Sequence, residues 1–227
     1  MKYKHEKDII SRMYKEFPAT VSEIDIKMLR SIQDEFTAGF KLLANQGPFV
    51  TTFGSARIKP GDPVYALGVK LGEALAKEGY AVLTGGGPGC MEAVNKGAKE
   101  ANGKSMGINI SIPIEQNSNP YAIPSITMNH FFVRKVLLLK FSTAYIFLPG
   151  GYGTLDELFE TITLVQNGKI KKLPIILIDT AFWHGLMEWI NERLITDGLI
   201  GPNDTKYFKI VDTVEEAIEV IRTTLTA

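Results

Sequence analysis

Cysteine is almost absent from this sequence, since Cys90 is the only one among 227 residues. A lone thiol cannot form an intramolecular disulfide, and it cannot build a sulfur-based metal site. The first ten residues, MKYKHEKDII, lack the apolar stretch of a signal peptide, and no apolar run approaches the roughly 20 residues that span a bilayer. We therefore expect a protein of the reducing cytoplasm that makes no contact with a membrane.

Net charge is absent as well, because 25 Lys and Arg residues balance 25 Asp and Glu residues. Proteins that bind nucleic acids usually carry a basic excess, so we expect no nucleic-acid partner, although a local basic patch would not show in the total. Hydrophobic residues make up 45% of the chain and charged residues 22%, which is typical of a globular protein with a sizeable core. This composition argues against disorder and against a disulfide scaffold.

Residues 1–47 are predicted to form an N-terminal helical arm, because apolar residues recur at helical spacing from Ile24 to Leu43 before Gly47 and Pro48 break the pattern. In residues 48–227, short apolar runs alternate with longer helical segments, which predicts an α/β domain with a parallel sheet and helices on both faces. The expected strands are residues 49–53, 80–84, 105–110, 125–128, 144–148, 174–178 and 207–210. The expected helices are residues 64–78, 91–101, 131–142, 155–166, 182–197 and 214–224.

Three of the expected strands are followed by segments rich in small residues, at 54–57 (GSAR), 85–89 (GGGPG) and 149–154 (PGGYGT). Ligands of a parallel sheet bind beyond the carboxyl ends of its strands, and a helix that begins there offers unpaired N–H groups to a phosphate. Glycine often marks only a turn, but three such loops at one edge favour a phosphate site. From the first two loops we expect five substrate-binding residues: Gly54, Ser55, Arg57, Gly86 and Gly87.

Two familiar phosphate motifs do not fit these loops. Cys90 stands at the third glycine position of the dinucleotide fingerprint, and no acidic residue ends the next strand. The Gly103-Lys104-Ser105 segment is similar to the end of a P-loop, but Ala98 occupies the earlier glycine position and the segment enters a strand. Neither a nicotinamide enzyme nor an ATPase is favoured.

Charged residues near these loops have two interpretations each. Thr154 and Glu157 have the spacing of a helix capping box, and the alternative is that Glu157 points at a sugar while the loop holds an anion. Segment 131–142 (FFVRKVLLLKFS) is apolar almost all round and is expected to be buried, so Arg134 would need a carboxylate or phosphate partner. Lys135 can extend to the surface, and Glu115 is by itself more often a solvated loop charge.

Histidine carries no expected chemistry, because the three residues of this type are scattered along the chain. His130 precedes the segment that contains Arg134. We expect it to cap a helix or to be partly buried.

Three of these segments together identify a resemblance. Residues 85–92 (GGGPGCME), 131–135 (FFVRK) and 149–157 (PGGYGTLDE) resemble the Lonely Guy family, and the similarity runs from about residue 49 to about residue 178. Members of that family are cytokinin riboside 5′-monophosphate phosphoribohydrolases, often labelled lysine decarboxylases. The decarboxylase label has no support in the sequence, because neither a Schiff-base lysine nor a partner for the pyridine ring is identifiable.

The resemblance implies a modified Rossmann fold, a homodimer or larger homo-oligomer, and hydrolysis of the N-glycosidic bond of a nucleoside 5′-monophosphate. It implies that Arg134 and Glu157 are the catalytic pair, with Glu115 as a second catalytic acid. Phosphate would be held by Gly150, Gly151, Gly153 and Thr154, and Phe131 and Lys135 would also contact the substrate. Phe131 stands where shorter members often have methionine, and the arm exceeds the short form.

We therefore predict an N-glycosidase that acts on AMP or an N6-substituted AMP, with no metal and no cofactor. The alternative is a non-catalytic carrier that binds a nucleotide or a phosphorylated cofactor such as molybdenum cofactor with the same loops. Arg134 and Glu157 favour the enzyme, since phosphate binding alone does not require an acid. A purely structural protein would leave the glycine-rich edge unexplained.

Overall fold

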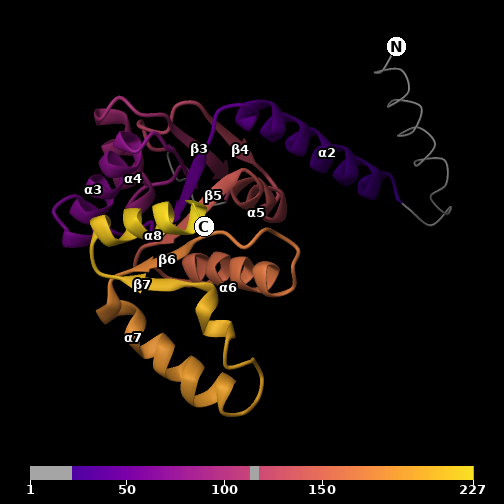
Figure 1. Ribbon diagram of the computed structural model, residues 1–227. Coiled ribbons are helices and arrows are strands. Elements are labelled where there is room, and N and C mark those ends of the chain that lie inside the picture. Colours follow the sequence, from indigo (N-terminus) through magenta and orange to yellow (C-terminus); the bar gives the residue numbers. More distant parts are fainter. Residues whose placement is uncertain (1–21, 113–117, 227) are drawn as a thin grey trace.

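The computed structural model describes residues 22–112 and 118–226, which form an α/β structure around one parallel sheet (Figure 1). Seven strands lie in the order β4-β3-β2-β1-β5-β6-β7. Their bounds are β1 Phe49–Phe53, β2 Ala81–Thr84, β3 Ser105–Ile110, β4 Ser125–Met128, β5 Ser142–Phe147, β6 Ile175–Ile178 and β7 Lys209–Val211. Every pair of neighbouring strands is parallel, which confirms the predicted fold class.

Helices cover both faces of the sheet. On one face, α3, α4 and α8 pack through a core that contains Leu71, Val94 and Ile218. On the other face, α2, α5, α6 and α7 share a second core that contains Leu137 and Trp183. The bounds are α2 Glu23–Leu43, α3 Pro63–Lys77, α4 Cys90–Glu100, α5 Phe131–Lys140, α6 Tyr152–Gln166, α7 Thr180–Trp189 and α8 Val214–Thr226. Within the described residues, no helix is long and apolar enough to cross a membrane.

Several predicted bounds differ from the structure. The helix expected at 182–197 begins at Thr180, because the side chain of Asp179 caps it, and it continues as a π-helix, η1 (Ile190–Ile195). The strand expected at 207–210 begins two residues later, after a short 3₁₀ helix, η2 (Asp204–Tyr207). The start of α7 follows the carboxyl end of β6, whereas β7 begins at the opposite edge of the sheet.

The strand order places a topological switch beside β1. The chain runs outward from β1 through β2 and β3 to β4, and then returns to add β5 on the other side of β1. The loops that follow β1 and β5 therefore turn away to opposite sides of the sheet and leave a crevice between them. The first and third glycine-rich loops lie at this crevice.

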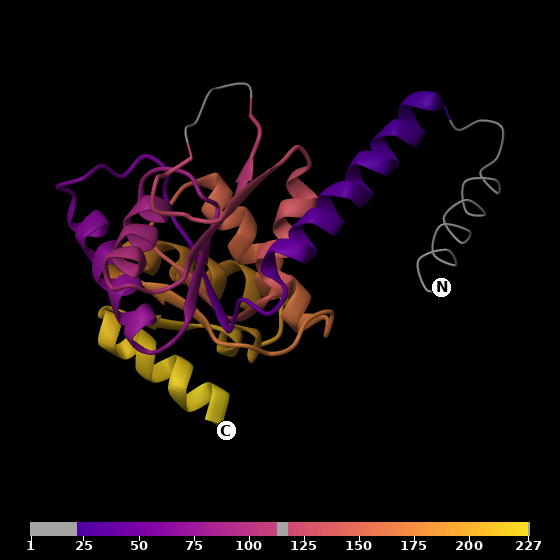
Figure 2. The same cartoon turned by 90° about the horizontal axis from the view of Figure 1, so that it is seen from above.

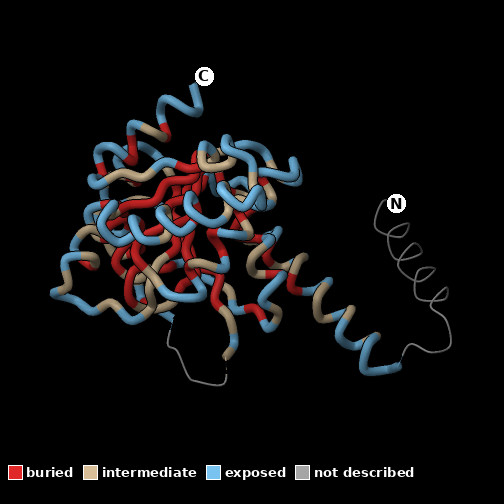
Figure 3. Tube along the Cα trace, turned by 90° about the horizontal axis from the view of Figure 1, so that it is seen from below, coloured by how far each residue is buried: buried red, intermediate tan, exposed pale blue. Residues whose placement is uncertain are grey.

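Helix α2 is the described part of the predicted arm. A capping box of Ser22 and Asp25 begins it, and its first half projects away from the sheet (Figure 2). The buried residues Glu35, Gly39 and Leu43 lie in its second half, which joins the body of the protein (Figure 3). Leu43 belongs to the second core, together with Leu137 and Trp183, so the arm shares a core with the rest of the protein. The division into two domains between residues 47 and 48 stays a prediction.

Helix α5 is buried on one side only, so the expectation that segment 131–142 is buried holds for one side and is wrong for the other. Val133 and Leu137 face the sheet and are fully buried. Phe131, Phe132 and Val136 are 55%, 47% and 40% exposed, because no described element packs over that side. An apolar strip is thus left open beside the crevice.

Close packing of α3 against α4 gives a stability prediction. A Cβ on Gly72 would overlap the backbone carbonyl of Val94, and backbone atoms cannot move aside as a side-chain tip can. We expect Gly72→Ala to lower the free energy of unfolding by about 1–3 kcal/mol, measured by urea denaturation. Gly185→Ala is the control, because open space surrounds that glycine in the exposed part of α7, and alanine there should stabilise the protein by about 0.5–1 kcal/mol. Equal effects at both positions would contradict the packing argument.

Candidate active site

The three glycine-rich loops meet at Ser55, which follows β1. Its backbone N–H donates to the carbonyl of Pro149 at 3.0 Å, and its carbonyl accepts from the backbone N–H of Cys90 at 2.9 Å. Gly54 is required by space, because a Cβ there would collide with Cys90 and press against Leu148. The loops that the sequence shows as three separate segments therefore form one structure at the carboxyl edge of the sheet.

This structure borders a cavity of about 590 Å³. Nine of the predicted site residues line it: Gly54, Ser55, Arg57, Phe131, Arg134, Gly151, Gly153, Thr154 and Glu157. Among the described residues, four predicted positions do not line it: Gly86, Gly87, Lys135 and Gly150. Glu115 lies outside the described residues, so nothing is said of its position. The catalytic and binding roles of all these residues stay predictions.

The second glycine-rich loop is held from behind by a buried amide. Asn119 donates its backbone N–H to the carbonyl of Gly86 and its side-chain N–H to the carbonyl of Gly87, both at 2.9 Å. Gly86 has a φ of 68°, a left-handed conformation that suits glycine. Gly86 and Gly87 do not line the cavity, whereas their neighbour Gly85 does.

Arg134 reaches from the first turn of α5 into the cavity. Its Nε donates to the carbonyl of Ile108 at 2.8 Å, and its Nη1 lies 3.9 Å from Oε1 of Glu157. Its Nη2 lies where a Cβ on Gly85 would be, so Gly85 is glycine to make room for the guanidinium. Burial lowers the pKa of Arg134 and the charge of Glu157 opposes that effect, but an arginine keeps its proton at any physiological pH.

Glu157 is a buried acid with an incomplete set of partners. Its side chain is 7% exposed, and its Oε2 has no hydrogen-bond partner among the described residues. Burial raises its pKa to about 7, against the lowering effect of Arg134 and Lys135 and with the help of Glu160 and Asp156. A carboxyl group that changes charge near neutral pH inside a cavity is typical of a catalytic acid or base.

Lys135 contacts α6 and does not line the cavity. Its Nζ lies 2.9 Å from Asp156 and 2.7 Å from Glu160, and these two ion pairs raise the pKa of the lysine in spite of partial burial. The lysine is positioned to tie α5 to α6 and to offset the negative charges beside Glu157. A direct contact with substrate would require these pairs to rearrange.

Helix α6 opens directly onto the cavity. It begins at Tyr152 with Gly151 as N-cap and without a side-chain cap, so of the two interpretations of Thr154 and Glu157 the capping box is wrong. The helix starts three residues earlier than the box requires, and its first N–H groups have no partner within the helix. A Cβ on Gly151 or Gly153 would meet open space. An anion can therefore come close to the N–H groups at this end of the helix.

Apolar side chains also line the cavity. This apolar wall consists of Phe53, Met91, Ile110, Ile112 and Phe131, of which the sequence argument named only Phe131. Phe53 and Ile110 are the last residues of β1 and β3, and that position alone could have identified them. A flat apolar ring system fits such a wall, with a charged group at the α6 end. No cluster of three or more His, Cys, Asp or Glu side chains suited to a metal ion occurs in the part of the chain described.

Comparison with known proteins identifies the family. The family model described as "Possible lysine decarboxylase" matches residues 91–221, which is more than half of the chain. The chain belongs to this family, the Lonely Guy family. A cytokinin riboside 5′-monophosphate phosphoribohydrolase of Mycobacterium tuberculosis is 32% identical over 155 residues, covering 67% of this chain and 82% of the relative. One of Rhodococcoides fascians is 28% identical over 179 residues, covering 76% and 88%.

Solved structures support the fold of this Lonely Guy protein. The X-ray structure of TM1055 aligns with a TM-score of 0.56 and 29% identity, over 77% of this chain and 98% of that chain. A molybdenum cofactor binding protein of Rippkaea orientalis aligns with a TM-score of 0.59 and 24% identity, over 80% and 99%. At that identity the second likeness shows the architecture alone.

Proposed function

We propose that this Lonely Guy protein hydrolyses the N-glycosidic bond of a purine nucleoside 5′-monophosphate, AMP or an N6-substituted AMP. The observation that carries the proposal is the buried pair of Glu157 and Arg134, 3.9 Å apart, beside an uncapped helix end in one cavity. Relatives named phosphoribohydrolases support it. We further propose that the protein acts in the cytoplasm and needs no metal or cofactor.

The proposed binding mode follows the polarity of the cavity. The 5′-phosphate lies at the N-terminus of α6, where unpaired N–H groups and the helix dipole favour an anion. The purine lies against the apolar wall formed by Phe53, Ile110 and their neighbours. The ribose then lies between them, beside Glu157.

The proposed reaction breaks the bond between C1′ and the purine nitrogen. Water gives a hydroxyl group to C1′ and a proton to the departing base, which leaves adenine and ribose 5-phosphate. Positive charge grows on the sugar as the bond breaks, and the ionised carboxylate of Glu157 stabilises it and orients the water, as carboxylates do in glycoside hydrolysis. Arg134 holds Glu157 ionised and positioned, and the gripped phosphate fixes the orientation of the sugar.

The deciding experiment is a chromatographic assay for free base. We expect adenine from AMP and free base from isopentenyl-AMP, whereas adenosine, which lacks the phosphate, reacts poorly. Thermal stabilisation by many phosphorylated ligands without release of any base would favour the carrier alternative. That alternative uses the same helix end but gives Glu157 no task.

The rate should depend on pH through Glu157. Because the ionised carboxylate is the reactive form and its pKa is about 7, kcat should rise from pH 5 to about pH 8 and then level off. The second proton of a nucleotide phosphate leaves at about pH 6, and this change alters free AMP and therefore its binding. The quantity to measure is kcat at saturating AMP, because kcat reports only the groups of the enzyme–substrate complex. A kcat that is constant from pH 5 to 8 would contradict this role of Glu157.

We also propose that the protein is a homodimer or larger homo-oligomer. The apolar strip of Phe131, Phe132 and Val136 on α5 is open, and Phe131 also lines the cavity, so a second copy over this strip would border the site. Light scattering after size-exclusion chromatography tests this. A wild-type protein that is monomeric at micromolar concentration would contradict it.

A further inference from the structure

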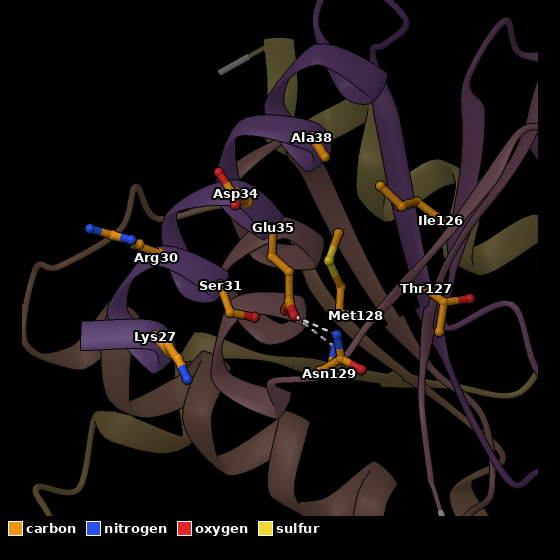
Figure 4. A pocket seen from close by; sticks show the side chains of 10 residues that line it. All are labelled: Lys27, Arg30, Ser31, Asp34, Glu35, Ala38, Ile126, Thr127, Met128 and Asn129. Atoms are coloured by element: carbon orange, nitrogen blue, oxygen red, sulfur yellow. Dashed lines mark hydrogen bonds between the residues drawn. The ribbon is translucent and has the colours of Figure 1, made fainter. Parts of the chain in front are cut away.

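A groove between α2 and the edge strand β4 lies outside the cavity described above, and a buried acid lies in its floor (Figure 4). Glu35 points from α2 toward Asn129, which immediately follows β4. The residue is only 9% exposed, although it belongs to the arm.

Glu35 accepts four hydrogen bonds from two consecutive residues. Its Oε1 accepts from the backbone N–H of Asn129 at 3.0 Å, from the side-chain amide of Asn129 at 3.0 Å and from the ring of His130 at 3.1 Å. Its Oε2 accepts from the backbone N–H of His130 at 3.2 Å. Burial raises the pKa of Glu35, but these hydrogen bonds outweigh that effect and leave the pKa below its ordinary value, so the group is a carboxylate at neutral pH.

These hydrogen bonds cap α5 from outside. His130 is the N-cap of α5, as expected from the sequence, but its side chain makes no capping bond. The carboxylate of Glu35 instead accepts the N–H of His130 itself, one of the groups that the start of a helix leaves unpaired, and puts a negative charge near the positive end of the helix, where charge of that sign is favoured.

Only one residue, His130, lies between this cap and Arg134. The N–H of His130 donates to Glu35, and the carbonyl of His130 accepts the backbone N–H of Arg134 at 3.2 Å. The side chain of Arg134 then reaches Ile108 and Glu157 in the cavity. Loss of the cap would let the first turn of α5 fray, and the guanidinium would lose its fixed position.

The rest of α2 is attached to α5 independently of Glu35. Gly39 lies against Leu137, close enough that a Cβ would overlap it, and the ring of Phe40 lies 5.9 Å from that of Phe141. Leu137 lies in the carboxyl-terminal half of α5, and Phe141 is its C-cap. A change at Glu35 therefore loosens the start of α5 while α2 stays docked.

We infer that Glu35 is a positioning residue for the proposed hydrolysis: its carboxylate, supplied by the arm, fixes the first turn of α5 and so holds Arg134 against Glu157. The inference rests on the proposed function for its kinetic consequences. The contact that it assigns is a property of the fold and is measurable without turnover.

The kinetic test compares Glu35→Ala, Glu35→Gln and the control Asp34→Asn, which removes an exposed charge from the adjacent position of the same groove. We expect Glu35→Ala to lower kcat for AMP by about 10- to 100-fold, as small misplacements of a catalytic group do. KM should change much less, because the α6 end that would bind phosphate does not touch Glu35. Glu35→Gln keeps one acceptor oxygen and should recover part of the rate, and Asp34→Asn should equal wild type.

The structural test follows the carboxyl carbon of Glu157 by ¹³C NMR as pH changes, with Glu157→Gln used for assignment. Withdrawal of Arg134 removes a positive neighbour, so Glu35→Ala should raise the pKa of Glu157. This titration needs no substrate. If wild-type protein releases no base from AMP, that result contradicts only the proposed function, and the titration still tests the inference. A folded Glu35→Ala variant with unchanged kcat and an unchanged Glu157 titration would overturn the inference. If Glu35→Ala does not fold, the same two readouts on Glu35→Gln decide it.

Discussion

Glu157→Gln is expected to lower the release of base from AMP by about 10²–10⁴-fold, the range typical of a lost acid–base group. Glutamine has the same shape, but it cannot carry the negative charge that the sugar requires in the transition state. Because the helix end of α6 is untouched, the variant should still bind AMP with nearly the wild-type dissociation constant, measured by calorimetry. Loss of turnover together with retained binding is the signature of a group that acts on the transition state.

The same variant should be more stable than wild type at alkaline pH. The pKa of Glu157 is about 7 in the folded protein, against 4.5 for an ordinary glutamate, so folding favours its protonated form. The stability from this group is complete below pH 4.5 and is lost as pH rises through 7. At pH 8 Glu157→Gln should therefore gain up to about 3 kcal/mol over wild type, and the gain should vanish near pH 4.5. Full turnover in this variant would refute the catalytic role of Glu157. Reduced stability at pH 8 would refute its raised pKa.

Arg134→Met should produce the second largest loss, about 10²–10³-fold in kcat, because one preorganised charge beside the reacting atoms is removed. Its loss also raises the pKa of Glu157, since Arg134 is the main group that lowers it, so the acid limb of the pH profile should move upward. Both effects are read from one series of kcat measurements between pH 5 and 9.

Arg134→Lys separates the two contributions of the arginine. Lysine keeps a positive charge near Glu157, so the pH profile should return toward that of wild type. It has no planar fork, and so it cannot bond the carbonyl of Ile108 and face Glu157 in the same way. The rate should therefore recover only in part. Arg193→Met, which removes the exposed ion pair between Arg193 on η1 and Asp197, is the matched control and should leave kcat unchanged.

The sheet and its functional edge could be predicted from the sequence because both are local patterns. Apolar runs of strand length give β1 to β6 within a few residues, and the glycine-rich loops follow directly from the positions of the strands. Arg134 could be predicted to face the site because a cation in an apolar helix needs a partner. The partner, Glu157, lies 3.9 Å away as the resemblance implies.

Contacts between distant segments could not be predicted in this way. The pairing of Lys135 with Asp156 and Glu160 depends on how α5 and α6 lie side by side, which no single window of sequence contains. Gly85 has an ordinary backbone conformation, and only the guanidinium beside it explains why it is glycine. The capping box of Thr154 and Glu157 shows that a local pattern can also mislead. The two residues have the right spacing, but α6 begins earlier, at Tyr152, so Thr154 is inside the helix and cannot be its N-cap.

Helix α2 also has a consequence for handling the protein. Strand β4 ends the sheet, and an edge of this kind recruits strands from other molecules unless it is shielded. Helix α2 forms a groove with β4, and Glu35 accepts the first N–H group beyond that strand. The strand pattern alone would suggest a shortened chain that starts at Pro48. Such a chain would lack α2 and would expose this edge and the apolar face of α5 on which α2 packs. Such a shortened chain should precipitate or form inclusion bodies on expression, whereas one that keeps α2 should remain dispersed.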